Sequence, residues 1–251
     1  MTSSAGGSRR ASGGSPSGRG PQRARTPRTP AARRERLRRV VDRLDEAYGR
    51  PVLAARLSPL GELVYTVLSQ NTADVNTDRT YAELTRRFPT WAQVRDAPVD
   101  EVEDAIALGG LAHVKAPRIV QILQAVSERT GEPDLGELDE MSDDEALHWL
   151  RQLPGVGPKT AACVLLFALG RPAMPVDTHV HRVAGRLGLL DPGVSAEDAH
   201  AILTRMAGPD PVDIYAAHVD LVRHGRRICH ARRPACDRCP VNDLCPSAFR
   251  V

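Results

Sequence analysis

The sequence predicts an all-α protein. From residue 34 onward, apolar residues recur at helical spacing, and no segment shows the apolar–polar alternation of a half-buried strand. Glycine and proline interrupt the periodic segments at short intervals, so we expect about ten short helices. The first helical segment follows the i, i+3, i+4, i+7 pattern with Leu37, Val40, Val41 and Leu44.

Nine further segments have the same spacing and are separated by helix breakers. In chain order they are residues 60–68, 75–88, 99–108, 114–126, 146–153, 160–169, 179–189, 196–206 and 212–222. The breakers are Pro89 and the Gly- or Pro-containing stretches 109–110, 131–133, 154–158, 170–172, 191–192 and 208–211. Because glycine and proline disfavour the helix interior, these stretches mark the helix ends.

The composition indicates a folded body preceded by a basic arm. With 251 residues, 41% of them apolar, the chain can form one large or two modest domains. Residues 1–33 contain seven arginines, no acidic residue and almost no large apolar side chain. Such a segment cannot bury enough surface to offset its ordering entropy, so we expect a disordered arm. It could lie along phosphates or be only a solvated tail.

The charge and hydropathy patterns limit the partners of the body. Removing the arm from the net charge of +3 leaves −4, so any nucleic-acid surface must be a local basic patch. No apolar run reaches the roughly 18 residues of a membrane span. No apolar segment follows the N-terminal arginines, as a secretory signal requires. We therefore expect no membrane partner and a cytoplasmic protein, associated with the nucleoid if the source is bacterial.

Lysine is almost absent from the chain. Of its 34 basic residues only Lys115 and Lys159 are lysine. Arginine replaces lysine well for charge and phosphate contacts, but its guanidinium stays protonated and cannot form a Schiff base. The retention of Lys159 therefore suggests amine chemistry. The alternative is a chance lysine near a helix start.

Lys159 follows a glycine turn, Pro-Gly-Val-Gly, at residues 154–157. Two glycines allow a tight turn, and N–H groups of the turn and of the following helix start form a donor site for an anion. The positive helix end and burial should lower the pKa of Lys159 from about 10.4. A neutral amine is what nucleophilic catalysis requires. The alternative is an ordinary helix–helix turn.

Asp177 begins the next helical segment. We expect its side chain to cap that helix. The helix N-terminus would keep the carboxylate ionised, so it could also face a developing positive charge. His179 and His181 are two residues apart and point to different sides of the helix, which argues against a metal site shared by them.

Four cysteines with the spacing C-x6-C-x2-C-x5-C close the chain; they are Cys229, Cys236, Cys239 and Cys245. Clustered cysteines without a secretory signal favour a metal centre over disulfides. Zinc and a [4Fe-4S] cluster both remain open, and the single C-x2-C pair favours iron–sulfur. Arg232 and Arg233 lie in the first loop and could contact phosphate, or the tail could be purely structural. Cys163 is isolated in an apolar segment and is expected in the core.

Three motifs in this order resemble the endonuclease III family of helix-hairpin-helix DNA glycosylases: LPGVGPKTA, VDTHVHRV and the cysteine spacing. The resemblance covers residues 34–246. It implies a two-lobed fold, with a six-helix domain at 58–171 that carries the hairpin. A second helical domain, at 34–57 and 172–251, would end in the [4Fe-4S] loop with the four cysteines as ligands. The implied partner is double-stranded DNA containing damaged bases or AP sites, bound by a monomer.

The same resemblance implies a base-excision-repair DNA glycosylase with AP lyase activity. Lys159 would attack C1′ of an extrahelical oxidised pyrimidine, and β-elimination would cut 3′ to the AP site. Asp177 would stabilise the cationic sugar and assist proton transfer. Lysine favours this bifunctional class over monofunctional adenine-excising relatives. A mismatch-specific or adenine-excising glycosylase and a non-catalytic DNA damage-binding module are the alternatives.

Two further segments resemble the loops that contact DNA in this family. In Gln70-Asn71-Thr72, Asn71 takes the usual glutamine position and Gln70 lies one residue earlier, so either could fill the gap left by a flipped nucleotide. In residues 110–115, Leu111 resembles the apolar inserter, although it could equally pack in the core. Lys115 would lie near a phosphate, where arginine could replace it. The hairpin residues Gly155, Val156 and Gly157 complete the expected DNA contacts.

Overall fold

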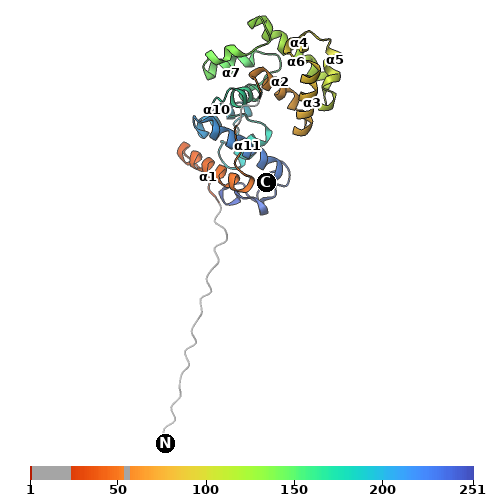
Figure 1. Cartoon of the computed structure of the whole chain (residues 1–251). Helices are drawn as coiled ribbons and strands as arrows, with labels where there is room; N and C mark the ends of the chain where they lie inside the picture. The colour runs from red at the N-terminus through yellow and green to blue at the C-terminus, as the bar shows by residue number, and fades with distance from the viewer. Residues whose placement is uncertain (2–23, 54–56) are drawn as a thin grey trace.

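The computed structural model describes residue 1, residues 24–53 and residues 57–251, and most of the expected basic arm lies outside them. Within the described residues the chain forms helices and no β-strand, so the predicted all-α class is confirmed. The helices form an elongated body, with α4, α5 and α6 toward one end and α1 and the C-terminus toward the other (Figure 1).

The predicted helical segments all overlap helices of the structure. The α-helices of the described chain are α1 (Pro30–Tyr48), α2 (Pro59–Ser69), α3 (Asp74–Arg87), α4 (Trp91–Asp96), α5 (Val99–Ala105), α6 (Ala112–Thr130), α7 (Asp143–Arg151), α8 (Pro158–Cys163), α9 (Thr178–Arg186), α10 (Ala196–Ala207) and α11 (Pro211–Arg227). Shorter 3-10 turns are η1 (Ala107–Gly109), η2 (Gly136–Glu140), η4 (Cys236–Arg238) and η5 (Asn242–Leu244), and η3 (Val164–Ala168) is a π-helical turn.

The structure differs from the predicted segments in three places. The sequence pattern misses α4, because six residues are too few to show a helical period. A capping box instead fixes its start: Gln93 N donates to Thr90 Oγ1 at 3.3 Å, and Thr90 N donates to Gln93 Oε1 at 3.1 Å. The segment predicted at 99–108 divides into α5 and η1, and that at 160–169 continues from α8 into η3.

Two hydrophobic cores hold the described chain together. One is built from buried side chains between Leu60 and Ala173, contributed by α2 to α8. The other combines α1 with residues from Leu166 to Leu244, including α9, α10 and α11. The chain passes from one core to the other around η3, so the sequence motifs at 153–161 and 176–183 lie near the junction of the cores.

The expected disorder of residues 1–33 is wrong for residues 24–33. Pro27 is buried, and Thr29 caps α1 by accepting from Ala32 N at 3.2 Å. Arg33 pairs with Asp191, and Gly188 packs against Thr26 and Pro27. These contacts with the second core offset the ordering entropy, which the local composition does not reveal.

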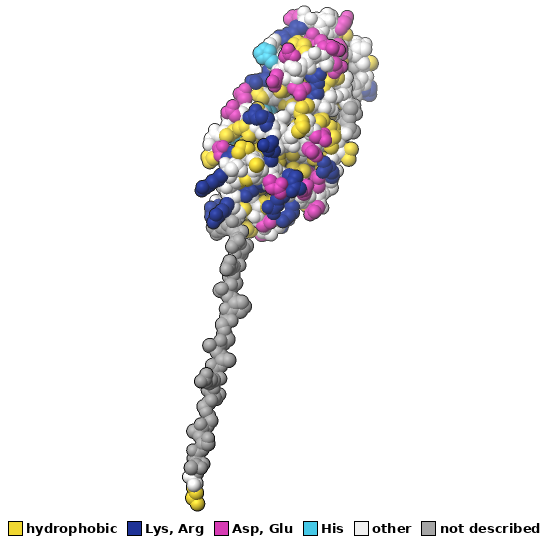
Figure 2. Space-filling view, turned by 90° about the vertical axis from the view of Figure 1, so that its left-hand side faces the viewer, with side chains coloured by type: hydrophobic (Ala, Val, Ile, Leu, Met, Phe, Trp, Pro, Cys, Tyr) yellow, Lys and Arg dark blue, Asp and Glu magenta, His cyan; other side chains and the backbone are white. Residues whose placement is uncertain are grey.

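The surface mixes basic and acidic side chains. On the face shown in Figure 2, basic side chains gather mostly over the half next to the N-terminal segment, with acidic side chains between them. Of the helices in the described parts of the chain, none has the length and apolar character of a membrane span.

Candidate functional site

The hairpin between α7 and α8 has the backbone that its glycines predict. Gly155 has a φ of 69°, so the turn favours glycine, and a Cβ there would also displace the Arg118 side chain, whose Nε would lie 2.6 Å away. Val156 is only 6% exposed, and its N–H donates to Leu153 O at 3.1 Å. Val156 therefore holds the turn internally, whereas Gly155 is exposed and Gly157 is the N-cap of α8.

Lys159 lies in the first turn of α8, as expected, but its surroundings differ from the prediction. The side chain is half-buried. The pKa of Lys159 is raised: the largest cause is the neighbouring Cys163, burial opposes it, and the charges of Asp177 and Glu62 add to it. The predicted lowering of this pKa is wrong, because nearby anionic and hydrogen-bonding groups outweigh the helix end and burial.

Cys163 lies one helical turn after Lys159 and is 1% exposed, as expected for a core residue. Burial raises the pKa of the Cys163 thiol more than Lys159 lowers it. The thiol is therefore protonated at neutral pH, where it favours the Lys159 ammonium through their hydrogen bond. The negative charge of the Cys163 thiolate acts on Lys159 only at higher pH, where the thiol loses its proton.

Asp177 caps α9, which confirms the expected capping role. Its Oδ1 accepts from Val180 N at 2.7 Å. Two histidines fix the segment that leads to Asp177. His218 Nδ1 lies 2.8 Å from Pro175 O, and His200 Nδ1 lies 2.9 Å from Met174 O. Burial lowers the pKa of His218 to about 4, so the neutral ring donates from Nδ1 and positions the carboxylate.

Glu62 is a site residue that the sequence analysis misses. It lies in α2, is 6% exposed and accepts from Thr66 Oγ1 at 3.1 Å. Its carboxylate acts on Lys159 and Cys163 from helix α2, which contacts α8. The sequence feature that could have identified Glu62 is its place within an otherwise apolar helical stripe.

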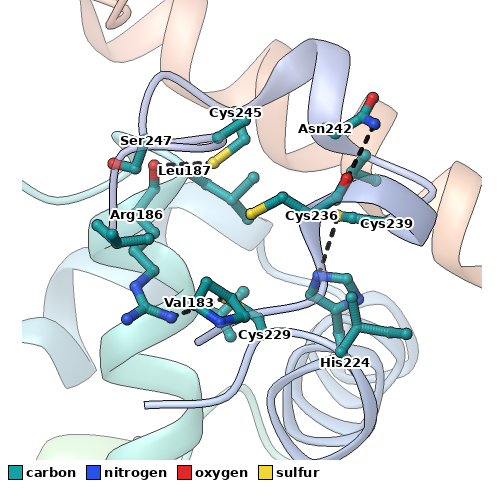
Figure 3. Close-up of a pocket in the computed structure, with 15 residues that line it drawn as sticks. Val183, Arg186, Leu187, His224, Cys229, Cys236, Cys239, Asn242, Cys245 and Ser247 are labelled. Atoms are coloured by element: carbon teal, nitrogen blue, oxygen red, sulfur yellow. Dashed lines mark hydrogen bonds between the residues drawn. The ribbon is translucent and has the colours of Figure 1, made fainter. Parts of the chain in front are cut away.

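The four C-terminal cysteines carry free thiols that line one cavity (Figure 3). Apolar side chains such as Val183, Leu187 and Val241 share its wall. In the part of the chain that the structure describes, no three His, Cys, Asp or Glu side chains converge on a point that could hold one metal ion. Sulfurs distributed around a cavity fit a cluster in which each iron takes one thiolate.

Two arginines of α9 hold the first loop of this cysteine motif. Arg186 donates to His230 O at 2.6 Å, to Ala231 O at 3.0 Å and to Cys229 Sγ at 3.3 Å. Arg182 donates to Cys229 O at 3.0 Å. Neither arginine was predicted as a site residue, although the sequence shows them four residues apart in the helical segment that follows Asp177.

Comparison with known proteins identifies the family. The model of the HhH-GPD superfamily of base excision DNA repair proteins matches residues 64–209, which is more than half of the chain. The model of the iron-sulfur binding domain of endonuclease III matches residues 229–245. The chain belongs to the endonuclease III family. It is a base-excision-repair DNA glycosylase with AP lyase activity, it binds DNA, and its C-terminal loop holds an iron–sulfur cluster.

Individual relatives agree with this placement. Endonuclease III of Thermotoga maritima is 34% identical over 71% of this chain and 78% of its own length. Endonuclease III of Escherichia coli is 33% identical over 84% of this chain and 95% of its own length. A protein named as a DNA glycosylase in Arabidopsis thaliana is 38% identical, but the match spans only 58% of that protein. A trapped endonuclease III–DNA covalent intermediate superposes with a TM-score of 0.71, at 27% identity over 86% of this chain and 96% of that one.

In this endonuclease III family member, Asn71 and Leu111 lie at the tips of neighbouring turns. Both are exposed, and both have left-handed backbones, with φ of 54° and 51°. Gln70 is half-buried, and its Oε1 accepts from Arg118 at 3.2 Å. The structure therefore presents Asn71, and not Gln70, at the surface, and it does not pack Leu111 into the core.

The expected phosphate contact of Lys115 is wrong. The residue is 2% exposed, and its ammonium donates to Leu68 O, Thr72 Oγ1 and Gly109 O. The α6 helix turns this side chain inward, which the sequence spacing does not show. Arg232 and Arg233, in contrast, are exposed in the cysteine loop, where a phosphate could reach them.

Proposed function

We propose that this enzyme excises oxidised pyrimidines from double-stranded DNA through a Schiff base on Lys159. The Lys159 amine attacks C1′, the glycosidic bond breaks, and the base leaves as it gains a proton. The attached amine then loses a proton and the C1′–O4′ bond opens, so that O4′ gains a proton and an iminium forms. Loss of a 2′ proton from this iminium expels the 3′ phosphate by β-elimination, and water releases the lysine. The observation that supports this is a lysine amine within electrostatic range of the Asp177 carboxylate at the junction of the two cores.

The raised pKa of Lys159 assigns a second task to Asp177. At neutral pH the resting amine is protonated, so it must lose a proton before it attacks. We assign Asp177 as the proton acceptor because it is half-buried at a helix N-terminus, whereas Glu62 lies deeper in the first core. The same carboxylate then stabilises the positive charge that develops on the sugar.

DNA contact is assigned to three exposed groups. The backbone N–H groups of Gly155 and Gly157 would bind a phosphate, and Arg232 and Arg233 would bind a second one beside the cluster loop. Asn71 and Leu111 would enter the duplex where the damaged nucleotide leaves it. We propose that one chain forms the complete site as a monomer, since all of these groups belong to one copy of the chain.

Borohydride trapping tests the mechanism. Wild type should form a covalent adduct with duplex DNA that carries thymine glycol or an AP site. Lys159→Gln and Lys159→Arg should fold and form none, because neither side chain can make an imine. An undiminished adduct with either variant would overturn the assignment of Lys159. Preferential base release from a G·T or A·8-oxoguanine pair would overturn the substrate class and leave the chemistry intact.

A further inference from the structure

Lys115 is a buried ammonium that joins two turns of the chain. Its Nζ donates to Leu68 O at 2.7 Å, at the end of α2, and to Gly109 O at 3.1 Å, at the end of η1. A third bond of 2.6 Å reaches Thr72 Oγ1 in the α2–α3 turn. Three N–H donors thus meet three oxygens, and two of these are carbonyls at helix ends, where positive charge is favoured.

Thr72 completes the junction. Its hydroxyl accepts from Lys115 and donates to Gly109 O at 2.5 Å, so the two turns are linked both through the ammonium and directly. The α2–α3 turn also closes on itself, because Thr72 N donates to Ser69 O at 3.2 Å. Neither turn can move away from the other without leaving buried polar groups unsatisfied.

Each of these turns carries one exposed residue with a left-handed backbone. Asn71 has a φ of 54° and Leu111 a φ of 51°. A left-handed leucine is rare, because its Cβ crowds the following carbonyl oxygen. Backbone of this kind persists only where the surrounding structure holds it, and it clusters at functional sites. The bonds of Lys115 and Thr72 supply that restraint.

We propose that Lys115 is a positioning residue that locks the two turns together, so that Asn71 and Leu111 meet the duplex as one rigid pair. This inference rests on the proposed function, in which these two side chains enter the DNA. Lys115 touches no substrate in this account. Its effect is to fix the separation of the two tips and to remove the entropy of arranging them when DNA binds.

Comparing a duplex substrate with a single-stranded one distinguishes a positioning role of Lys115 from a role in folding. Lys115→Met keeps the length of the side chain and removes all three donors. An AP site in a duplex needs the two tips, because the nucleotide must leave the stack, whereas an AP site in a single strand has no stacked partner to replace. We expect Lys115→Met to slow single-turnover strand cleavage of the duplex by about tenfold or more. Cleavage of the single-stranded AP site should stay within about twofold of wild type, since Lys159 is unchanged.

Three further variants complete the test, and the first of them is a control. Val126→Ala removes a fully buried side chain from the same helix α6, far along it from the turns, and should lower stability with an unchanged duplex-to-single-strand ratio. Thr72→Val removes the direct link without changing the size of the side chain, and it should reproduce the selective loss if Lys115→Met does not fold. Leu111→Ala should show the same selective loss, and combining it with Lys115→Met should add little, because both act on one element.

The proposal is overturned if Lys115→Met, or Thr72→Val in its place, keeps the wild-type ratio of duplex to single-strand rates. Full additivity of Lys115→Met and Leu111→Ala would also overturn it. Failure of the proposed function gives a different result, because wild type would then form no borohydride adduct with either substrate.

Discussion

Replacing Cys163 by alanine should make this enzyme less stable and more active at neutral pH. The thiol is 1% exposed and hydrogen-bonded to Lys159, and at neutral pH this hydrogen bond favours the ammonium form of the lysine. Alanine removes the sulfur and introduces no new polar group. The lysine then keeps its burial, which lowers its pKa, and loses the neighbour that raises it.

The gain in activity and the loss of stability are measured separately. Removing a charge-assisted hydrogen bond that favours the ammonium by about 1 kcal/mol should give about a fivefold larger neutral fraction of the amine at pH 7. Deleting one buried sulfur should cost about 1–2 kcal/mol of unfolding free energy. In a protein of this size such a loss lowers the melting temperature by roughly 2–8 °C.

Single-turnover cleavage of a preformed AP site, followed from neutral to alkaline pH, measures the effect on Lys159. Wild type should accelerate with rising pH, since the raised pKa keeps the amine protonated at neutrality. In Cys163→Ala the same rise should occur at lower pH. Cys163→Ser keeps a hydrogen-bonding group and should lie between the two. A profile for Cys163→Ala that superposes on that of wild type would refute the reasoning.

Three further changes test other parts of the molecule. Asp220 is fully buried and its pKa is raised to about 8, first by burial and then by Asp45, so the folded state holds a proton that the unfolded state releases. Stability should therefore fall as pH rises from about 4 to about 8, and Asp220→Asn should raise the melting temperature at pH 8 more than at pH 5; an equal shift at both would contradict this. Removing residues 1–23 takes away four arginines and should weaken DNA binding and flatten its salt dependence without removing cleavage, as a salt titration would show. Cys236→Ser should lower the iron content and the absorbance near 400 nm and destabilise the C-terminal loop; a colourless wild type that contains zinc would contradict the cluster assignment.

Much of the candidate site follows from short-range sequence information. The glycine hairpin, the helix cap at Asp177 and the cysteine spacing each depend on residues close together in the chain. Backbone freedom, capping and ligand spacing are local properties, so a sequence can specify them without its tertiary contacts. The all-α class follows for the same reason, because helical periodicity is visible in each segment separately.

The errors occur where distant residues meet. Residues 24–33 are ordered because they contact Gly188 and Asp191, more than 150 residues along the chain. Lys115 points inward because α2, η1 and α6 bring three oxygens around it. None of these outcomes is encoded within a single segment.

Local sequence motifs identify the candidate amine, carboxylate and four thiols of this enzyme. The protonation state of these groups and their partners depend on the tertiary fold. Lys159 shows the physical reason: its identity is local, but its pKa depends on the field of Cys163, Asp177 and Glu62 and on burial between the cores. The two lysines retained in an arginine-rich chain thus have different surroundings: Lys159, the proposed nucleophile, lies near the junction of the cores, and Lys115 is a buried link between two turns.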